Sequence, residues 1–541
     1  MMLFKKFHND LKQEFTDYNK SKCVSDLLAG LTVTAVAIPL ALAFGVGSGA
    51  TAASGLITAI VAGLLISALG GAYYQISGPT GAMAAILMSI IAKYDMQGVF
   101  IATVLAGIIL IFAGLLHLGK LISFIPMPVI TGFTSGIAII IALGQIDNFF
   151  GVQSQGSSTI EKLLSYGQLG FAPNWEATGI GCFVVLMMLV LPRLCGTLVP
   201  ASLLAIILAT MGNLLFGFNV TVVGEIPTTL FLDNRLEVAG LLDLNSLTNL
   251  LAPAASIAVL AMIESLLCGA TAGRMTGAPL DSNRELVAQG IGNLIVPFFG
   301  GIPATAAIAR TSVAVKSGAK TRLTGIFHAL GILAAMFILA PVMSQIPLAA
   351  LAGVLMVVSW RMNEWATISF MVDGKFAGAI FKFITTMLCT IIFDLTTAIV
   401  VGVMIGLILQ TVRFSHLRIT YDEIDPNRLH DRNSELPENG LVCYITGPIV
   451  FANTERLEGI AEKAQDYSYV YFSMRGVPDM DISGTQEFGK LVARLQAEGK
   501  EIYLCSVQED AMEMMRRGGI YAMVGQDCVY WSVERALCHG H

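Results

Sequence analysis

Two ionisable residues lie inside long apolar stretches of this 541-residue chain: Glu264 in ASIAVLAMIESLLCGATAG and Arg310 in TAAIARTSV. If these stretches cross a bilayer, an ionised side chain at the centre costs roughly 2.5 to 3.5 kcal/mol on insertion scales, so each is a functional candidate. The structural alternative is that the two pair with each other or with backbone groups and hold a helix bundle together. We favour a functional role.

Two segments are short and are interrupted by glycine and proline at their starts: Gln75 to Ile90 (QISGPTGAMAAILMSI) and Gly300 to Val315 (GGIPATAAIARTSVAV). We expect both to be half-helices that begin inside the membrane. A helix start leaves its first N–H groups unpaired and carries about half a positive charge, so two facing starts form an anion site. Paired broken segments in two halves of a chain also indicate a transporter's binding site.

Small residues at both starts would let an anion approach the backbone. They are Gly78, Thr80, Gly81 and Ala82 at the first start, and Ala306, Ala307, Ile308 and Ala309 at the second. Arg310 adds a full positive charge. The ligand expected from these residues is a small anion.

Glu264 would couple a cation to that anion. An ionised Glu264 opposes anion entry, whereas protonation removes the repulsion, so proton and anion would bind together. A sodium ion on Glu264, with hydroxyl or carbonyl oxygens nearby, is the competing role, although Cys268 one turn further on is a poor sodium ligand. Apart from a co-transported ion, we expect no cofactor.

The composition indicates which solvent surrounds these segments. The chain is 55% hydrophobic and only 13% charged, and its mean hydropathy is +0.72. Soluble proteins are about 25% charged. Charged residues number 28 in residues 27–410 but 31 in residues 421–541. These figures exclude a soluble globular protein and predict a membrane domain followed by a soluble domain.

The net charge and the cysteines limit which partners and which cellular location are expected. The net charge of −6 and the pI near 5.7 argue against a nucleic-acid partner. Nine cysteines without a CxxC pair or metal-type spacing are typical of reduced thiols in the cytosol. Lysines before the first span, at Lys5, Lys6, Lys12, Lys20 and Lys22, also place the N-terminus in the cytoplasm. We expect a multi-pass protein of the cytoplasmic membrane with both ends cytosolic.

Fourteen apolar runs are candidate membrane helices, an even number that returns the chain to its starting side. Their approximate limits are 27–48, 54–71, 78–93, 98–117, 125–145, 177–192, 198–217, 253–271, 285–300, 306–317, 323–341, 345–360, 376–393 and 395–413. A shift of 225 positions lays Thr80 on Thr305 and the first span on the eighth, which indicates two repeats. Because each repeat has seven spans, an odd number, the second must be inverted.

The expected organisation is a cytosolic N-terminal segment (1–26), a membrane transport domain (27–414), a linker (415–435) and a soluble tail (436–541). In the tail, the β-rich runs LVCYITGPIVF, YVYFSMRGV and EIYLCSV alternate with polar helical stretches. This pattern predicts a small α/β domain.

The membrane domain resembles the SulP family of anion transporters, the bacterial relatives of the animal sulfate, chloride and bicarbonate exchangers. With the tail described below, the resemblance covers nearly the whole chain. It rests on AVAIPLALAFGVGSG (Ala35 to Gly49), ISGPTGAMA (Ile76 to Ala84), MIESLLCGATAGRMTG (Met262 to Gly277), SNRELVAQGIGN (Ser282 to Asn293) and FFGGIPATAAIARTSVAVKSGAKT (Phe298 to Thr321).

This resemblance implies two inverted seven-span repeats arranged as a core domain and a gate domain, with the anion between the third and tenth helices, in a homodimer. The anion-binding positions that it implies are Thr80, Gly81, Ala307, Ile308, Ala309 and Arg310. Leu40 and Phe44 match cavity-lining positions of the first helix, and Glu264 matches the acidic position for cation coupling.

Two comparisons within the family bear on coupling and substrate. The sodium-coupled bicarbonate members carry Asp at the position of Glu264 and a hydroxyl residue at the position of Cys268, which argues against sodium here. The stretches IESLLC and PFFGGIPATAAIAR are most similar to the branch of bacterial four-carbon dicarboxylate transporters.

The tail resembles a STAS domain, with DISG (Asp481 to Gly484) as its signature loop at a helix start. In regulatory relatives the serine that matches Ser483 is phosphorylated, and a phosphate would be tolerated there. We expect Ser483 to cap the helix, with regulation as the alternative, and the domain to be open to a cytosolic partner.

The combined expectation is a secondary transporter that imports a small anion, such as sulfate, bicarbonate or a four-carbon dicarboxylate, by proton-coupled symport and alternating access. The alternatives are a sodium-coupled bicarbonate symporter, a passive anion channel and a membrane sensor whose STAS domain signals anion binding. An enzyme is not expected, because no His, Asp or Glu pair recurs inside the spans at ligand or general-acid spacing.

Overall fold

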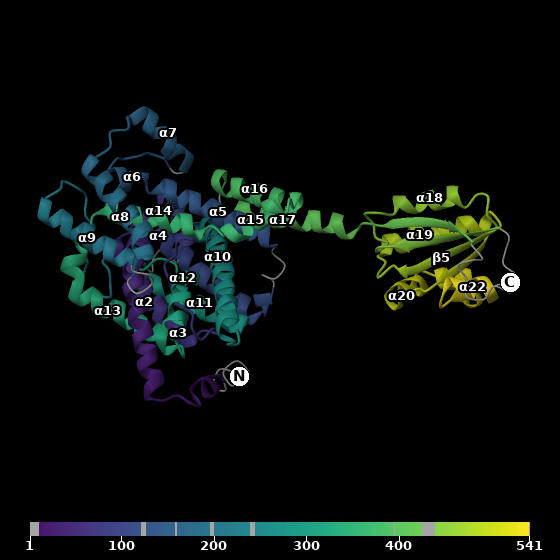
Figure 1. The fold of residues 1–541 in the computed structure, drawn as a ribbon, viewed down its shortest axis with the longest axis horizontal. Helices are drawn as coiled ribbons and strands as arrows, with labels where there is room; N and C mark the ends of the chain where they lie inside the picture. The colour runs from purple at the N-terminus through teal and green to yellow at the C-terminus, as the bar shows by residue number, and fades with distance from the viewer. Residues whose placement is uncertain are drawn as a thin grey trace. The chain divides into compact units, whose positions relative to one another are not determined.

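The computed structural model describes residues 10–120, 126–156, 159–194, 200–237, 244–393, 395–424 and 439–539. The chain divides into two compact units, Met1–Met404 and Ile405–His541 (Figure 1). The first unit consists almost entirely of helices, and the second is built on a β-sheet.

The helices of the first unit, and α17, which crosses from the first unit into the second, follow the predicted spans. Their bounds are α2 (Lys20–Gly47), α3 (Ala52–Leu69), α4 (Gly81–Leu115), α5 (Met127–Gly144), α6 (Ile146–Phe150), α7 (Thr159–Leu169), α8 (Trp175–Leu194), α9 (Ala201–Phe216), α10 (Leu244–Thr276), α11 (Ser282–Ile295), α12 (Ile308–Lys316), α13 (Leu323–Met343), α14 (Leu348–Met362), α15 (Trp365–Asp373), α16 (Ala377–Ile392) and α17 (Leu395–Phe414). Each predicted span overlaps one of them, whereas the short α6, α7 and α15 were not predicted. Among the described helices, seven are long and apolar enough to cross a membrane.

The third and fourth predicted spans both fall in α4, which is interrupted at Asp95 by a backbone φ of 56°. This positive φ breaks the helical hydrogen-bond ladder and separates two arms of the helix. The first arm begins at Gly81 and is therefore short, as expected for a half-helix.

Glycines let α4 and α11 approach closely. A Cβ on Gly290 would lie 2.6 Å from the carbonyl oxygen of Gly107, so a larger residue at position 290 would force the helices apart. Small residues serve this purpose in membranes, where lipid is as apolar as the helices themselves. The contact fixes α11 against the helix that begins at Gly81.

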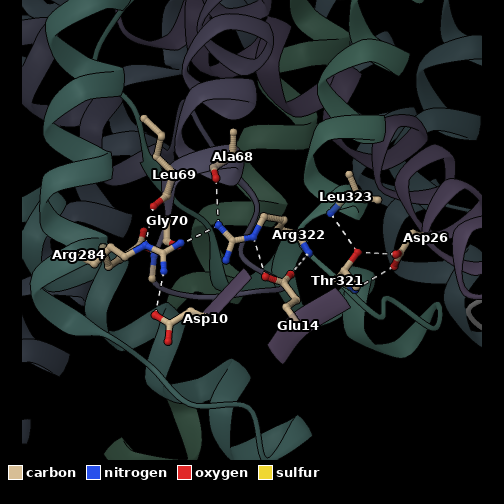
Figure 2. A network of polar contacts seen from close by, with 12 residues as sticks. Asp10, Glu14, Asp26, Ala68, Leu69, Gly70, Arg284, Thr321, Arg322 and Leu323 are labelled. Carbon is tan, nitrogen blue, oxygen red and sulfur yellow. Dashed lines mark hydrogen bonds and ion pairs between the residues drawn. The ribbon is translucent and has the colours of Figure 1, made fainter. Parts of the chain in front are cut away.

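The N-terminal segment is tied to the first unit by two ion pairs (Figure 2). Asp10 pairs with Arg284 at 3.0 Å, and Glu14 pairs with Arg322 at 2.7 Å. Both arginines also donate to backbone carbonyl oxygens at the end of α3. Because the end of a helix carries partial negative charge, the arginines stabilise α3 while the acids compensate the arginines.

Asp26 makes a second connection of the same kind (Figure 2). Its buried carboxylate accepts hydrogen bonds from the backbone N–H groups of Lys320 and Thr321, at 2.6 and 3.1 Å, and from the hydroxyl groups of Thr321 and Thr324, at 2.6 and 2.8 Å. These groups surround the start of α13. The beginning of α2 is therefore anchored to the beginning of α13.

The second unit contains a five-stranded sheet in the order β3-β4-β5-β6-β7, antiparallel between β3 and β4 and parallel elsewhere. The strands are β3 (Arg418–Glu423), β4 (Gly440–Thr446), β5 (Tyr469–Gly476), β6 (Glu501–Cys505) and β7 (Val529–Tyr530). The helices are α18 (Glu455–Lys463), α19 (Ile482–Ala497), α20 (Glu509–Arg517), α21 (Ile520–Val524) and α22 (Val533–His539). Because β3 belongs to the sheet, the domain includes part of the stretch assigned to the linker (415–435).

Alternate residues of the strands face two apolar layers. Phe472 of β5 packs against Phe488 of α19, with ring centroids 5.2 Å apart, in the larger layer. Tyr471, its neighbour in the strand, joins the smaller layer with α22. Burial raises the pKa of the thiols of Cys443 and Cys505 to about 12, so both stay protonated at neutral pH.

The start of α19 corrects one prediction. Asp481 caps this helix by accepting a hydrogen bond of 2.7 Å from the N–H of Gly484. Ser483 is exposed within the first turn. The prediction that Ser483 caps the helix is wrong, because the side chain one position before the helix already serves that N–H group. Regulation through Ser483 stays a prediction.

Candidate functional site

Two very short strands bring the broken segments together. β1 (Ser77–Gly78) pairs antiparallel with β2 (Thr305–Ala306). α4 begins shortly after β1, and α12 begins shortly after β2. Because the strands are antiparallel, the two helices leave the crossing in opposite directions and their starts lie close together. This arrangement agrees with the two half-helices predicted from the sequence.

The residues that correspond in the two halves differ from those given by the sequence shift. The residues before α4 and α12 are Thr80 and Ala307, which are separated by 227 positions, rather than 225. Thr305, which the shift laid on Thr80, lies in β2 instead. Small residues recur in both segments, so a shift of 225 positions aligns at least as many similar residues as the shift of 227 that aligns the two helix starts.

Both helix starts keep backbone donors for a ligand. The hydroxyl of Thr80 accepts from the N–H of Met83 at 3.4 Å, whereas Ala307 offers no side-chain cap to α12. Neither helix has an acidic residue in its first turn. Two partial positive charges are therefore left at one place, which favours a bound anion.

Arg310 is buried at this crossing with 1% of its surface exposed. Its Nη2 donates to the carbonyl oxygen of Pro79 at 2.8 Å, while Nε and Nη1 have no hydrogen-bond partner in the described part of the chain. Nη1 lies beside Gly78, where a Cβ would approach it to 2.8 Å. These two nitrogen atoms can donate charge-assisted hydrogen bonds to an anion.

Glu264 of α10 accepts a hydrogen bond of 2.9 Å from the hydroxyl of Thr80. Within the described residues, Glu264 and Arg310 form no ion pair, so the structural alternative of a direct pair is not observed. Arg310 does bond to a backbone group, the carbonyl oxygen of Pro79. The carboxylate instead contacts the residue that caps α4. A change in its protonation would therefore act directly on one helix start.

The other predicted residues lie around this centre to different degrees. A Cβ on Gly81 would lie 3.1 Å from a ring carbon of Phe44, which places this aromatic ring against the start of α4. Ile308 and Ala309 are exposed, so the start of α12 is accessible. Leu40 is half-buried and packs against the apolar core of the first unit.

A sodium site at Glu264 gains no further ligand from Cys268. The Cys268 thiol is buried and donates to the hydroxyl of Thr311 at 3.2 Å. In the described ranges, no three His, Cys, Asp or Glu side chains gather as metal ligands.

Several supporting residues were missed by the sequence analysis. The hydroxyl of Ser265 lies 2.9 Å from that of Thr305 in β2. Glu285, Gln289 and Asn293 of α11 are fully buried beside β1 and β2. Their signal was present in SNRELVAQGIGN, where these three polar residues recur every four positions on one face of a helix.

The profile of the sulfate permease family matches residues 24–385, and that of the STAS domain matches residues 432–536. The putative sulfate transporter YvdB of Bacillus subtilis is 35% identical over 95% of this chain and 97% of its own. The bicarbonate transporter BicA of a Picosynechococcus species is 28% identical over 95% of this chain and 94% of its own.

Solved structures show the same fold. The murine solute carrier 26 family member A9 anion transporter covers 96% of this chain and 92% of its own with a TM-score of 0.83 at 17% identity. The transmembrane domain of a cyanobacterial bicarbonate transporter, BicA, covers 72% of this chain and 98% of its own with a TM-score of 0.64 at 28% identity. These likenesses confirm the predicted polytopic helical fold with a C-terminal STAS domain.

Proposed function

The chain belongs to the sulfate permease family, a family of transporters and not enzymes, and we propose that it imports sulfate by proton-coupled secondary active transport. The observation that carries this proposal is the buried guanidinium of Arg310. Two of its nitrogen atoms lack hydrogen-bond partners in the described part of the chain, next to two helix starts without acidic residues.

The charge of the site favours a dianion that enters with a proton. Each helix start contributes roughly half a positive charge and Arg310 one, which gives about two in total. An ionised Glu264 lowers this sum to about one, whereas a protonated Glu264 leaves it at about two. A dianion is therefore balanced when Glu264 carries a proton.

Geometry supports sulfate before the other candidate anions. Sulfate concentrates two charges in one small group that both helix starts can share. A four-carbon dicarboxylate separates its charges at two ends. Bicarbonate carries a single negative charge, which would balance the net charge of the site when Glu264 is ionised and therefore needs no proton. Sodium coupling is the competing mechanism, since a cation on Glu264 would neutralise it as a proton does.

Uptake into proteoliposomes tests substrate and coupling together. Labelled sulfate, bicarbonate and fumarate are offered with pH and sodium gradients imposed separately. We expect sulfate to accumulate against its gradient when the outside is acidic, with no response to sodium. Accumulation of only fumarate or bicarbonate would change the substrate. Flux without accumulation would show a channel, and binding without flux would show a sensor.

The proposal also covers the location, the membrane topology and the oligomeric state of the protein. The protein would span the cytoplasmic membrane as a homodimer, with both ends and the STAS domain in the cytosol. Cross-linking in membranes and protease access from each side test these features independently of transport.

A further inference from the structure

We propose that Gln289 and Asn293 of α11 are positioning residues that align the two helix starts and thereby set the affinity for the anion. The inference rests on the proposed function. Both side chains act through β1 and β2, the strands that lead into α4 and α12.

Gln289 connects α11 to β1. Its Nε2 donates to the hydroxyl of Ser77 at 3.0 Å and to the carboxylate of Glu285 at 2.9 Å. The other oxygen of Glu285 accepts from the N–H of Gly71 at 2.9 Å. Because an oxygen of Glu285 accepts from Nε2, the NH2 end of the amide, and not its oxygen, faces both Glu285 and Ser77. The connection from α3 to β1 is thus held by α11 at both of its ends.

Asn293, one helical turn further on, connects α11 to the residue before β2. Its Nδ2 donates to the carbonyl oxygen of Ala304 at 2.9 Å, and its Oδ1 accepts from the N–H of the same residue at 2.8 Å. The side-chain amide therefore pairs with the backbone as a neighbouring strand would. It leaves no backbone group of Ala304 without a partner.

The spacing of these two residues matches the spacing of the strands. Positions four apart on a helix differ by about 6 Å in height, and paired strands lie about 4.8 Å apart. Successive polar residues of α11 can therefore hold adjacent strands. The strands end only a few residues before Thr80 and Ala307, so a shift of either strand moves a helix start.

All of these contacts are buried, which makes each one costly to remove. Ser77, Glu285, Gln289 and Asn293 are fully buried. A lost partner leaves a polar group unsatisfied in a medium without water, so the strand would move to compensate. The expected consequence is a misaligned anion site in a protein that still folds.

A double-mutant cycle on the full chain tests the inference. Ser77→Ala removes the hydrogen bond between Ser77 and Gln289, and Gln289→Met removes that bond together with the one to Glu285. We expect each to raise the KM for sulfate about tenfold, with the maximal rate changed less than twofold, and the double variant to match the single ones. Ser77→Thr, which keeps the hydroxyl, should retain most of the affinity. Thr390→Val is the matched control, because this buried hydroxyl donates to the carbonyl oxygen of Thr386 in the same helix, α16.

Hydrogen exchange without any anion gives a second measurement. In Gln289→Met and in Asn293→Leu, amides of residues 77–83 and 304–311 should exchange faster while those of α16 stay unchanged. An unchanged KM, additive effects in the cycle or acceleration throughout the first unit would overturn the inference. If the wild-type protein transports sulfate and the variants match it, only this inference fails. If the wild-type protein transports no anion, the proposed function fails first.

Discussion

Two buried arginines in the first unit have opposite surroundings. Arg322 is 4% exposed and pairs with Glu14, which is itself 1% exposed, while its Nη1 donates to carbonyl oxygens at the end of α3. Arg310 is 1% exposed, and its recorded hydrogen bond is to Pro79, with two nitrogen atoms left unfilled in the described part of the chain. Arg322 therefore has a carboxylate at ion-pair distance, whereas Arg310 has none within the described residues.

This difference separates a structural role from a binding role. A buried charge is costly unless a countercharge and hydrogen bonds surround it, so a compensated pair stabilises the fold only as long as both members are present. A buried cation without an ion-pair partner can instead be stabilised by binding an anionic ligand. The two arginines should therefore respond to the same substitution in opposite ways.

Arg310→Met should have the largest effect on transport. It removes a full positive charge and two donors worth roughly 1.5 to 3 kcal/mol each, so sulfate uptake should fall about a hundredfold or more. The melting temperature in detergent should change little, because Arg310 forms no ion pair within the described residues and its substitution breaks none. Uptake within tenfold of the wild type would place the anion elsewhere.

Arg322→Met should have the largest effect on stability. It leaves the carboxylate of Glu14 without its countercharge and the carbonyl oxygens at the end of α3 without their donor. Breaking a buried ion pair costs roughly 3 to 5 kcal/mol. Thermal unfolding in detergent measures the loss. Glu14→Gln should also destabilise, and combining the two should cost less than the sum. Equal stability of Arg322→Met and Arg310→Met would remove the distinction between the arginines.

Glu264→Gln should change the pH response more than the fold. In the proposed mechanism, protonation of the carboxylate admits the dianion, so uptake by the wild type should rise severalfold as the outside pH falls from about 8 to about 6. The amide is permanently neutral, and it can still bond to Thr80. The variant should therefore give a flat pH profile, and a profile like that of the wild type would exclude Glu264 as the proton carrier.

The sequence identified Arg310 but could not show its difference from Arg322. Apolar surroundings and broken segments mark Arg310, because the membrane makes charge rare. Arg322 follows a polar stretch and attracts no attention until its partner, 308 positions earlier, is placed beside it. Such long-range pairs leave no periodic pattern. The polar residues of α11 do recur every four positions, but Ser77, the partner of Gln289, lies 212 positions earlier and was hidden for the same reason.

The smallest effect on stability is expected in the second unit. Here a polar side chain that accepts structural hydrogen bonds lies two positions from one that is exposed. Asp481 accepts from the N–H groups of Gly484 and Phe451, at 2.7 and 2.8 Å, whereas Ser483 is exposed. Asp481→Ala should cost about 1 to 2 kcal/mol of local stability, which hydrogen exchange at the first turn of α19 would measure. Ser483→Ala should leave that exchange unchanged. Because Ser483 is exposed and does not cap α19, any effect of Ser483→Asp on sulfate uptake would have to come from the added charge. Such an effect would support regulation at this position.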